Sequence, residues 1–489
     1  MVAGRLTEKT KDASRSACSF PRRPETRSTA PRTKMAMKAW SMAGIGGSLT
    51  ENRWQEEAWP VLTHPAFFCA AEARAWYDAH FMNQAQPSVQ PRQAAVYFIL
   101  VTVVLDMLSF GIIIPVLPKL VEEFLGGDTA QAAEIYGLMG TSWALMQFVC
   151  SPIQGALSDR FGRRPVVLLS NLGLGLDFIL MAMAPSLSWL FAGRVISGIA
   201  SSSFSTAGAY IADVTPPEKR AAAFGLMGAS FGLGFVLGPA VGGLLGALDP
   251  RWPFWGAAAT SLLNACYGFF VLPESLPLEK RAPFRWQRAN PAGALILLRS
   301  HHELFGLATA NFLMNLAHAV LPSVAVLYLG YRYGWGPSAV GFTLAAVGIC
   351  AMIVQGTLVR RITAKLGERR TLLTGLLCGA TGFAIYGLAP TPFVYCLGIP
   401  VMAFWGLAGP SAQVFMTRRV SASEQGQLQG AIASLTGIAG LIGPTLFTQT
   451  FALFIGPQAD WHLPGAPYLL STMLLLVSAG TAWRATRPT

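Results

Sequence analysis

The sequence predicts an all-α polytopic membrane protein with twelve transmembrane helices in two six-helix, pseudo-symmetric halves. The first observation is composition: 53% of the residues are hydrophobic and 12% are charged, and the mean hydropathy is +0.45. A water-soluble core could not bury that much apolar surface. The second observation is that basic residues gather in alternate loops, and the third is that the two halves repeat one another.

Residues 1–90 differ in kind from the rest of the chain. They are basic, rich in Ser, Thr and Pro, and hold no run long enough to cross a membrane, so we expect a disordered extension. Their arginine-rich character resembles a transit peptide, although Trp54, Trp59 and Trp76 are unusual in one. Met82 opens a short polar lead-in to the first apolar run, so we expect translation to start there.

The remaining chain divides into a first half at 91–272, a cytoplasmic linker at 273–303 and a second half at 304–489. Each half is expected to hold six apolar runs of bilayer-crossing length. The predicted spans are 96–117, 135–153, 166–183, 187–212, 224–245, 253–272, 304–329, 340–359, 372–388, 394–415, 428–447 and 468–483.

Positive charge marks one side of the predicted membrane protein. The loops after the even-numbered spans, together with the C-terminal tail, hold 19 Lys and Arg. The opposite loops hold three, which are Lys119, Arg251 and Arg332. Because loops rich in Lys and Arg stay in the cytoplasm, this bias predicts an even number of spans with both termini cytoplasmic.

An internal repeat relates the two halves. Sliding the sequence on itself by 205 residues places Gly162 on Gly367, and Gly238-Pro239 on Gly443-Pro444. A parallel repeat of this kind is typical of transporters in which one half rocks against the other.

A short basic island lies between the second and third spans. Its glycines, aspartate and arginines are Gly155, Asp159, Arg160, Gly162, Arg163 and Arg164. The glycines permit a tight turn where helices meet, and Asp159 can face a helix N-terminus or Arg163. The island resembles the signature loop of the major facilitator superfamily, G-x-L-a-D-r-x-G-r-r. The resemblance implies a twelve-helix fold and a gate between the halves, with Asp213 as a further member of the charge cluster.

The fifth span carries a run of small residues: Gly234, Gly238, Pro239, Gly242 and Gly243. Close helix packing in lipid explains small residues at intervals of four. The same run resembles the antiporter motif of proton-driven drug exporters, G-x-x-x-G-P-x-x-G-G, at every position. Both explanations stay open at this point.

Ionisable residues inside spans are few and costly, so each one indicates a function. Those in question are Asp106, Asp177, Arg194 and His318. Asp106 is expected to take up and release a proton, with a structural hydrogen bond as the alternative. Arg194 is always charged and needs a partner, which we expect to be Asp106 or Asp177. His318 fits either a core position or a pore lining.

A narrower resemblance covers 95–483. Asp106 followed by Pro115 and Pro118, Asp177 within Leu-Asp-Phe, and Asp213 at the end of Gly-Ala-Tyr-Ile-Ala-Asp all look like the tetracycline/proton antiporters. This resemblance implies that Asp106 and Asp177 are the membrane-embedded acids and that Arg194 is their counter-ion. It also implies that Gln355 is a drug-site side chain.

Two residues expected from that resemblance are missing. By alignment, Ala351 stands where the antiporters carry a histidine in the eighth helix, and Gly379 stands where they carry an aspartate in the ninth. These departures put the proton pathway of the second half, and tetracycline itself as substrate, in question.

The sequence also argues against other classes of protein. The seven cysteines lack metal-ligand spacing, and the chain has no P-loop and no nucleophile set, so we expect no metal, no cofactor and no enzyme. The net charge of +12 is accounted for by the basic loops, so we expect no nucleic-acid partner.

Together these patterns predict a monomeric, proton-coupled efflux antiporter of the bacterial inner membrane that exports tetracycline-like or other amphipathic drugs by alternating access. Its energy would come from the proton gradient, although Na⁺ coupling stays open. The side chains expected to contact substrate in a central cavity are Asn311, Asn315, His318, Gln355 and Gln413. The alternatives are an uptake or facilitated-diffusion carrier for a small metabolite and, from another class, a membrane sensor or enzyme.

Overall fold

The computed structural model describes residues 93–201, 203–284, 302–421, 424–456 and 459–487. The chain divides into two units, Met1–Gln90 and Pro91–Thr489. The first unit, with the expected extension and Met82, lies outside the described residues. Within the ranges given above, the second unit consists of helices and short turns and contains no strand. The all-α prediction is confirmed.

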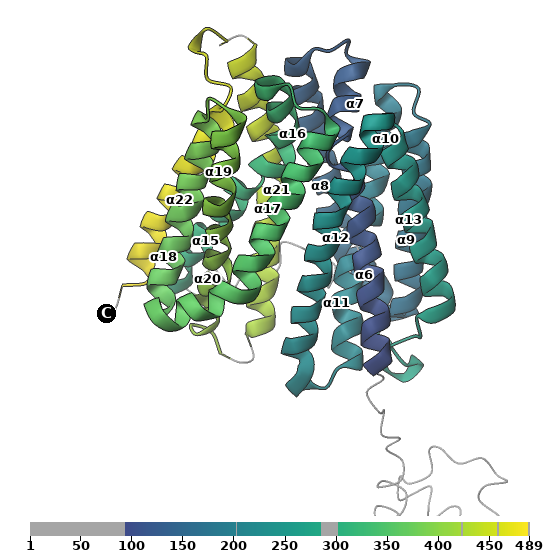
Figure 1. The fold of residues 1–489 in the computed structure, drawn as a ribbon. Coiled ribbons are helices and arrows are strands. Elements are labelled where there is room, and N and C mark those ends of the chain that lie inside the picture. The colour runs from purple at the N-terminus through teal and green to yellow at the C-terminus, as the bar shows by residue number, and fades with distance from the viewer. Residues whose placement is uncertain (1–92, 202, 285–301, 422–423, 457–458, 488–489) are drawn as a thin grey trace, which may run out of the picture. The chain divides into compact units, whose positions relative to one another are not determined.

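The first group of helices runs from purple to teal in Figure 1 and lies on one side of the unit. We call it the N-terminal helices. They are α6 (Gln93–Ile113), α7 (Leu117–Phe124), α8 (Thr129–Phe161), α9 (Arg163–Ala182), α10 (Leu187–Ala200), α11 (Ser203–Val214), α12 (Arg220–Leu248) and α13 (Trp252–Val271). Short 3₁₀ turns follow α11 at Pro217–Lys219 and α13 at Leu278–Lys280.

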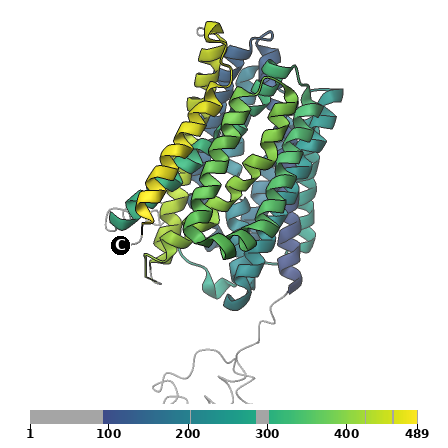
Figure 2. The same ribbon diagram turned by 60° about the vertical axis from the view of Figure 1, so that its left-hand side comes forward.

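The second group, green to yellow, comes forward in Figure 2, and we call it the C-terminal helices. Its α-helices are α15 (His302–His318), α16 (Val320–Tyr333), α17 (Pro337–Ile353), α18 (Val359–Leu388), α19 (Pro392–Ala403), α20 (Ala408–Thr417), α21 (Gln425–Ile455) and α22 (Ala466–Ala485). A π-helical segment, η7 (Val354–Leu358), joins α17 to α18. Two 3₁₀ segments, η8 (Phe404–Leu407) and η9 (Ala459–Trp461), complete the group.

Every predicted span lies on these helices. Among the described residues, nine helical stretches are long and apolar enough to cross a membrane, and one of them, Pro337–Leu388, contains two predicted spans. The predicted spans outside the nine are those on α8 and on α10 with α11. The chain is a multi-pass membrane protein.

Two of the spans predicted in the first half are interrupted. The first ends early, at Ile113, because Pro115 and Pro118 cannot donate backbone hydrogen bonds to the preceding turn. The fourth is divided into α10 and α11, where the Ser201 hydroxyl donates to the Gly198 carbonyl at 3.1 Å. Serine side chains that bond to the backbone in this way compete with helical hydrogen bonds.

Three spans of the second half are also irregular. The break between α15 and α16 at Ala319 precedes Pro322, which has no N–H to donate to the His318 carbonyl. The 3₁₀ segment η8 precedes Pro410, which likewise cannot bond to the carbonyl four residues before it. The π-helical segment η7 contains no proline, so no comparable sequence signal announces it.

Each group of helices has its own apolar core. In the N-terminal helices, Met139, Phe178 and Phe254 are fully buried in one cluster. The core of the C-terminal helices contains several buried tyrosines, and the rings of Tyr328 and Tyr468 lie 5.1 Å apart. Ala133 of α8 also belongs to the cluster of the C-terminal helices, so the two groups touch through α8.

Candidate functional site

The predicted gate loop is a turn between α8 and α9. Gly162 has a φ of +107°, a conformation that glycine adopts readily, and α9 begins directly after it. Arg163 lies 2.5 Å from Asp159 and 3.1 Å from Asp213, from Nη1 and Nε respectively. The structure therefore brings together the two acids and the arginine that the sequence assigned to one cluster.

The other two arginines of the motif contact aromatic rings. Arg164 donates to the Phe269 carbonyl and stacks on the Phe269 ring, whereas Arg160 stacks on the exposed ring of Phe161. A side chain at Gly155 would meet no atom within 4 Å, so close packing does not explain that glycine.

Sequence reasoning missed Glu274, which joins the linker to the gate loop. Its carboxylate accepts the backbone N–H groups of Arg163 at 2.9 Å and Arg164 at 3.3 Å, at the start of α9. A carboxylate there satisfies free N–H groups and complements the positive end of the helix. A Cβ on Gly162 would overlap the same carboxylate, so the glycine and Glu274 fit one another.

The second half repeats the gate loop with its charges exchanged. Gly367, which the repeat places on Gly162, also has a positive φ, of +75°. The same offset of 205 residues places Glu368 on Arg163 and Arg418 on Asp213. Arg418 donates to both carboxylate oxygens of Glu368, at 2.6 and 2.7 Å. The repeat thus keeps the ion pair and inverts its polarity.

Asp106 lies inside α6 with 5% of its surface exposed. Its carboxylate accepts a hydrogen bond from the hydroxyl of Ser203, the first residue of α11. Arg194 is not its partner. Ser203 is a contact that no sequence pattern indicated.

Asp177 and Arg194 form a second buried group, 2% and 6% exposed, between α9 and α10. Ser197 joins them: its hydroxyl donates to Asp177 and accepts from Arg194 Nη2 at 2.9 Å. The Cβ position of Gly193 would lie 3.1 Å from Asp177 Oδ1, so this glycine makes room for the carboxyl group. Of the two partners expected for Arg194, the structure places Asp177 beside it.

The glycines of the antiporter motif use two faces of α12. Alanine at Gly234 or Gly238 would place its Cβ 2.6 Å from an atom of α6, and one at Gly242 would overlap the Ile112 carbonyl. Gly243 instead faces α17, where its Cβ would lie 2.6 Å from the Pro337 carbonyl oxygen. The motif therefore packs α12 against the helix that carries Asp106 and against the C-terminal helices.

Two seams between the N-terminal and C-terminal helices have close contacts toward the end opposite the gate loop. In the first, between α12 and α17, the Pro239 carbonyl oxygen lies so close to Gly341 that a Cβ there would overlap it. The Ser338 hydroxyl donates to the Gly243 carbonyl at 3.2 Å. In the second, between α8 and α21, the hydroxyls of Thr141 and Thr445 lie 2.8 Å apart. The described state is joined at that end.

The polar residues expected to contact substrate separate into two kinds. Asn311 is buried, and its carbonyl accepts from the Asn315 side chain at 2.8 Å, which is a local helix contact. Gln413 donates to Gln429 at 3.4 Å. Gln413, His318 and Gln355 are all exposed, and all three lie within the predicted spans. Asn311, Asn315 and Gln413 therefore make hydrogen bonds within the protein.

The departures at Ala351 and Gly379 have different surroundings. A Cβ at Gly379 would lie 2.8 Å from Trp405 Cγ and 2.9 Å from Leu475 Cδ1, so an aspartate does not fit there. Ala351 lies at the end of α17, half-buried. The indole ring of Trp405 fills the space that a ninth-helix carboxyl group would need.

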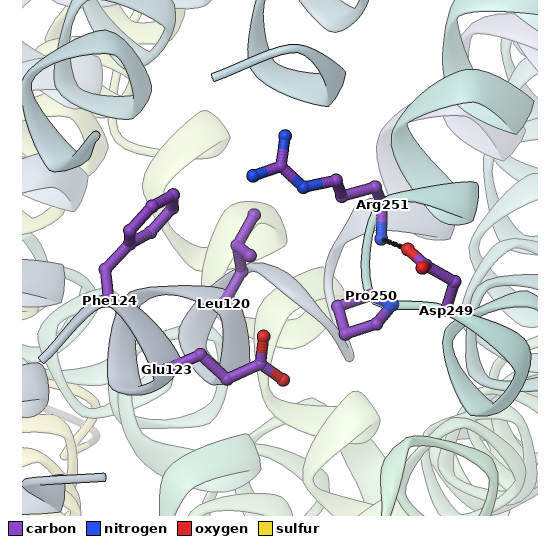
Figure 3. Close-up of a pocket in the computed structure, with 6 residues that line it drawn as sticks. All are labelled: Leu120, Glu123, Phe124, Asp249, Pro250 and Arg251. Atoms are coloured by element: carbon purple, nitrogen blue, oxygen red, sulfur yellow. Dashed lines mark hydrogen bonds between the residues drawn. The ribbon is translucent and has the colours of Figure 1, made fainter. Parts of the chain in front are cut away.

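Figure 3 shows a pocket at the end opposite the gate loop, which the sequence did not predict. It has a volume of about 310 Å³ and is lined by Leu120, Glu123, Phe124, Asp249, Pro250 and Arg251. The Arg251 guanidinium donates to the Ala182 carbonyl at 3.0 Å, which ties the turn before α13 to α9. Within the described parts of the chain, no group of three or more His, Cys, Asp or Glu could hold a metal ion.

Comparison with known proteins agrees with this architecture. The chain is 37% identical to the class C tetracycline resistance protein of Escherichia coli over 383 residues, 78% of this chain and 95% of that protein. The human organic anion transporter MFSD10 (TETRAN) has a similar structure, with a TM-score of 0.61, 25% identity, and coverage of 81% of this chain and all of that one. A bacterial homologue of the human lysosomal transporter Spinster, in an inward-facing and unoccupied conformation, has a TM-score of 0.65 at 17% identity, over 82% of this chain and 97% of its own.

One family model matches the part of the chain that contains the gate loop, both buried acids and the antiporter motif. The family model described as Major Facilitator Superfamily matches residues 99–444, from within α6 to within α21. With a match over most of its length, the chain belongs to the major facilitator superfamily.

Proposed function

We propose that this protein is a proton-coupled efflux antiporter of the bacterial inner membrane, exporting tetracycline-like or other amphipathic drugs. The observation that carries the proposal is the pair of buried acid sites, Asp106 with Ser203 and Asp177 with Ser197 and Arg194, in a chain similar to a tetracycline resistance protein over 95% of that protein. Carboxyl groups at membrane depth are typical of proton relays.

Alternating access would use residues 91–272 and 304–489 as two rocking halves, joined by the linker at 273–303. The gate-loop end would be cytoplasmic, as would both termini, because the basic loops gather there. The two seams at the opposite end then close the outer side, so the described state would admit substrate from the cytoplasm. We expect the gate loops to meet when the outer seams open.

Proton coupling would act through the fourth span. Ser197 and Ser203, which hydrogen-bond the two acids, lie on opposite sides of the interruption between α10 and α11. A change of angle at this interruption would alter both carboxyl sites together. In one state of the cycle each acid would exchange its proton with one side of the membrane, and in the other state with the opposite side. The proton gradient would supply the energy, and no cofactor would take part.

The test uses inside-out vesicles from cells that lack other drug pumps. An imposed pH gradient, acidic inside, should drive tetracycline accumulation by the wild-type protein. Asp106→Asn removes the exchangeable proton and should abolish accumulation while membrane insertion stays normal. Glu134→Gln is the matched control, because Glu134 is exposed on α8. Equal accumulation by Asp106→Asn and the wild type would refute proton coupling at this residue.

The second candidate is a carrier that takes up or equilibrates a metabolite. The complete glycine motif on α12 favours antiport, because it resembles the motif of proton-driven drug exporters at every position. The direction of the substrate flux distinguishes the two candidates. Movement of substrate in the same direction as the protons would identify the uptake carrier.

A further inference from the structure

The pocket in Figure 3 lies between α7 and the turn that joins α12 to α13. Each segment supplies half of its lining: Leu120, Glu123 and Phe124 come from α7, and Asp249, Pro250 and Arg251 from the turn. Glu123 and Asp249 are exposed and lie outside the predicted spans. The pocket is therefore open to water at the end opposite the gate loop, where a soluble molecule can reach it.

The one basic side chain of this lining is already engaged. The Arg251 guanidinium donates to the Ala182 carbonyl at 3.0 Å. Arg251 meets Asp249 through its backbone, because its N–H donates to Asp249 Oδ1 at 2.7 Å. In Figure 3 the guanidinium extends away from the Asp249 carboxylate. The positive charge of the lining therefore does not occupy that carboxylate.

Two carboxylates remain available to a ligand. Asp249 bonds through Oδ1, which leaves Oδ2 as an acceptor. Within the described parts of the chain, the Glu123 carboxylate makes no hydrogen bond or ion pair. Glu122 differs, because Lys119 donates to it at 2.6 Å and the Thr129 hydroxyl also donates to it. With two acids and one arginine, the lining has a net charge of −1 and favours a positively charged donor.

The remaining walls of the pocket are apolar. Leu120 is buried in the core of the N-terminal helices, and Phe124 packs against that core. An aromatic ring such as that of Phe124 attracts a positive group near its face. The volume of about 310 Å³ is near the lower end for ligand pockets, which is about 300 Å³, and suits a molecule with a single ring.

We propose that this pocket binds a small organic ammonium ion. The ammonium N–H groups donate to Glu123 and Asp249, and the apolar body of the ion packs against Leu120 and Phe124. An anion would be repelled by the two carboxylates, and a neutral ring would leave them without a donor. A metal ion is a poorer fit, because no group of three His, Cys, Asp or Glu could hold one among the described residues. The proposal does not depend on the export function, since the two carboxylates lie outside the predicted spans.

The test is protection of a thiol in the pocket of the purified full-length protein. Pro250→Cys is introduced into a cysteine-free background, and its reaction with a neutral methanethiosulfonate is timed. Phenethylammonium is the probe, because an alkyl amine is protonated at pH 7. Phenylacetate and 2-phenylethanol are the anion and the neutral molecule of similar size. With a Kd of about 1 mM, phenethylammonium at about 10 mM should slow the reaction about tenfold, whereas the other two should leave it unchanged.

Two kinds of variant separate charge from shape. Glu123→Gln with Asp249→Asn keeps the size of both side chains, and the new amide oxygen can still accept from the Arg251 N–H, but the protection should be lost. Phe124→Leu should weaken protection by about threefold. Glu134→Gln is the matched control, because Glu134 is an exposed acid on α8, and it should protect like the wild type.

Three results would overturn the proposal: equal protection by phenethylammonium and phenylacetate, protection by neither, or protection that survives Glu123→Gln with Asp249→Asn. Binding of the probe elsewhere in the protein would not shield this thiol. Failure of the export function would be seen separately, as absent tetracycline accumulation in vesicles by a protein whose pocket thiol phenethylammonium still protects.

Discussion

Replacing Gly243 with alanine should weaken the seam between α12 and α17. The new Cβ would lie 2.6 Å from the Pro337 carbonyl oxygen and 3.1 Å from Gly341 Cα, and both are backbone atoms that cannot rotate away. To restore an ordinary contact, the two helices must separate by about 0.8 Å. Overpacking of this kind costs about 1–3 kcal/mol. The better helix propensity of alanine does not offset this cost, because α12 would be helical whether the seam is closed or open.

This penalty falls on the state in which the seam is closed, so the population should shift at least about fivefold toward the open seam. Spin labels at Gln131 and Phe393, both exposed near the seam end of their helices, would report the separation of the two groups of helices in a cysteine-free background. The variant should show more of the longer distance.

Gly228→Ala is the matched control on the same helix. A Cβ at Gly228 would meet no atom within 4 Å, so only the gain in helix propensity remains, and the distance distribution should stay that of the wild type. If Gly243→Ala and Gly228→Ala gave the same distribution, the assignment of Gly243 to the seam would be refuted.

Three further outcomes follow from the contacts described. Glu274→Gln should lower the stability of the protein by about 1–2 kcal/mol, measured by thermal unfolding, because the start of α9 loses its carboxylate; the exposed Glu279→Gln should not. Glu368→Arg should impair transport, and the double variant Glu368→Arg with Arg418→Glu should restore it. If the double variant stayed inactive, the ion pair between these two residues would not be what transport requires of them. Gly379→Asp should destabilise the protein by about 1–3 kcal/mol, since the Trp405 ring occupies the space; wild-type thermal stability would contradict that packing.

The regular features of this fold could be predicted because they depend on local sequence. Apolar runs and basic loops marked the spans, and the offset that aligned Gly162 with Gly367 aligned two residues that both have positive φ. The same offset places Glu368 on Arg163, so the exchanged ion pair was also present in the sequence as a signal.

The partners of the buried charges could not be predicted, because they depend on contacts between distant segments. Ser203 lies 97 residues from Asp106, and Glu274 lies 111 residues from Arg163. Nothing in the local pattern distinguishes Ser203 from the serines beside it.

The irregular helices are an intermediate case. Pro322 signals the break after His318, because proline has no backbone N–H to donate to the His318 carbonyl. The π-helical segment that carries Gln355 has no such marker. The ring contact between His318 and Trp405 and the position of Gln355 beside Gly406 therefore emerged from the structure, although His318 and Gln355 were each candidates by sequence.

Proton coupling through Asp106 is the central claim, and two fluxes in proteoliposomes test it most directly. Asp106→Asn should retain the exchange of labelled for unlabelled tetracycline at equal pH, because binding and rocking of the halves need no net proton transfer. It should lose accumulation driven by a pH gradient, which the wild-type protein should show. Undiminished gradient-driven accumulation by Asp106→Asn would contradict the account.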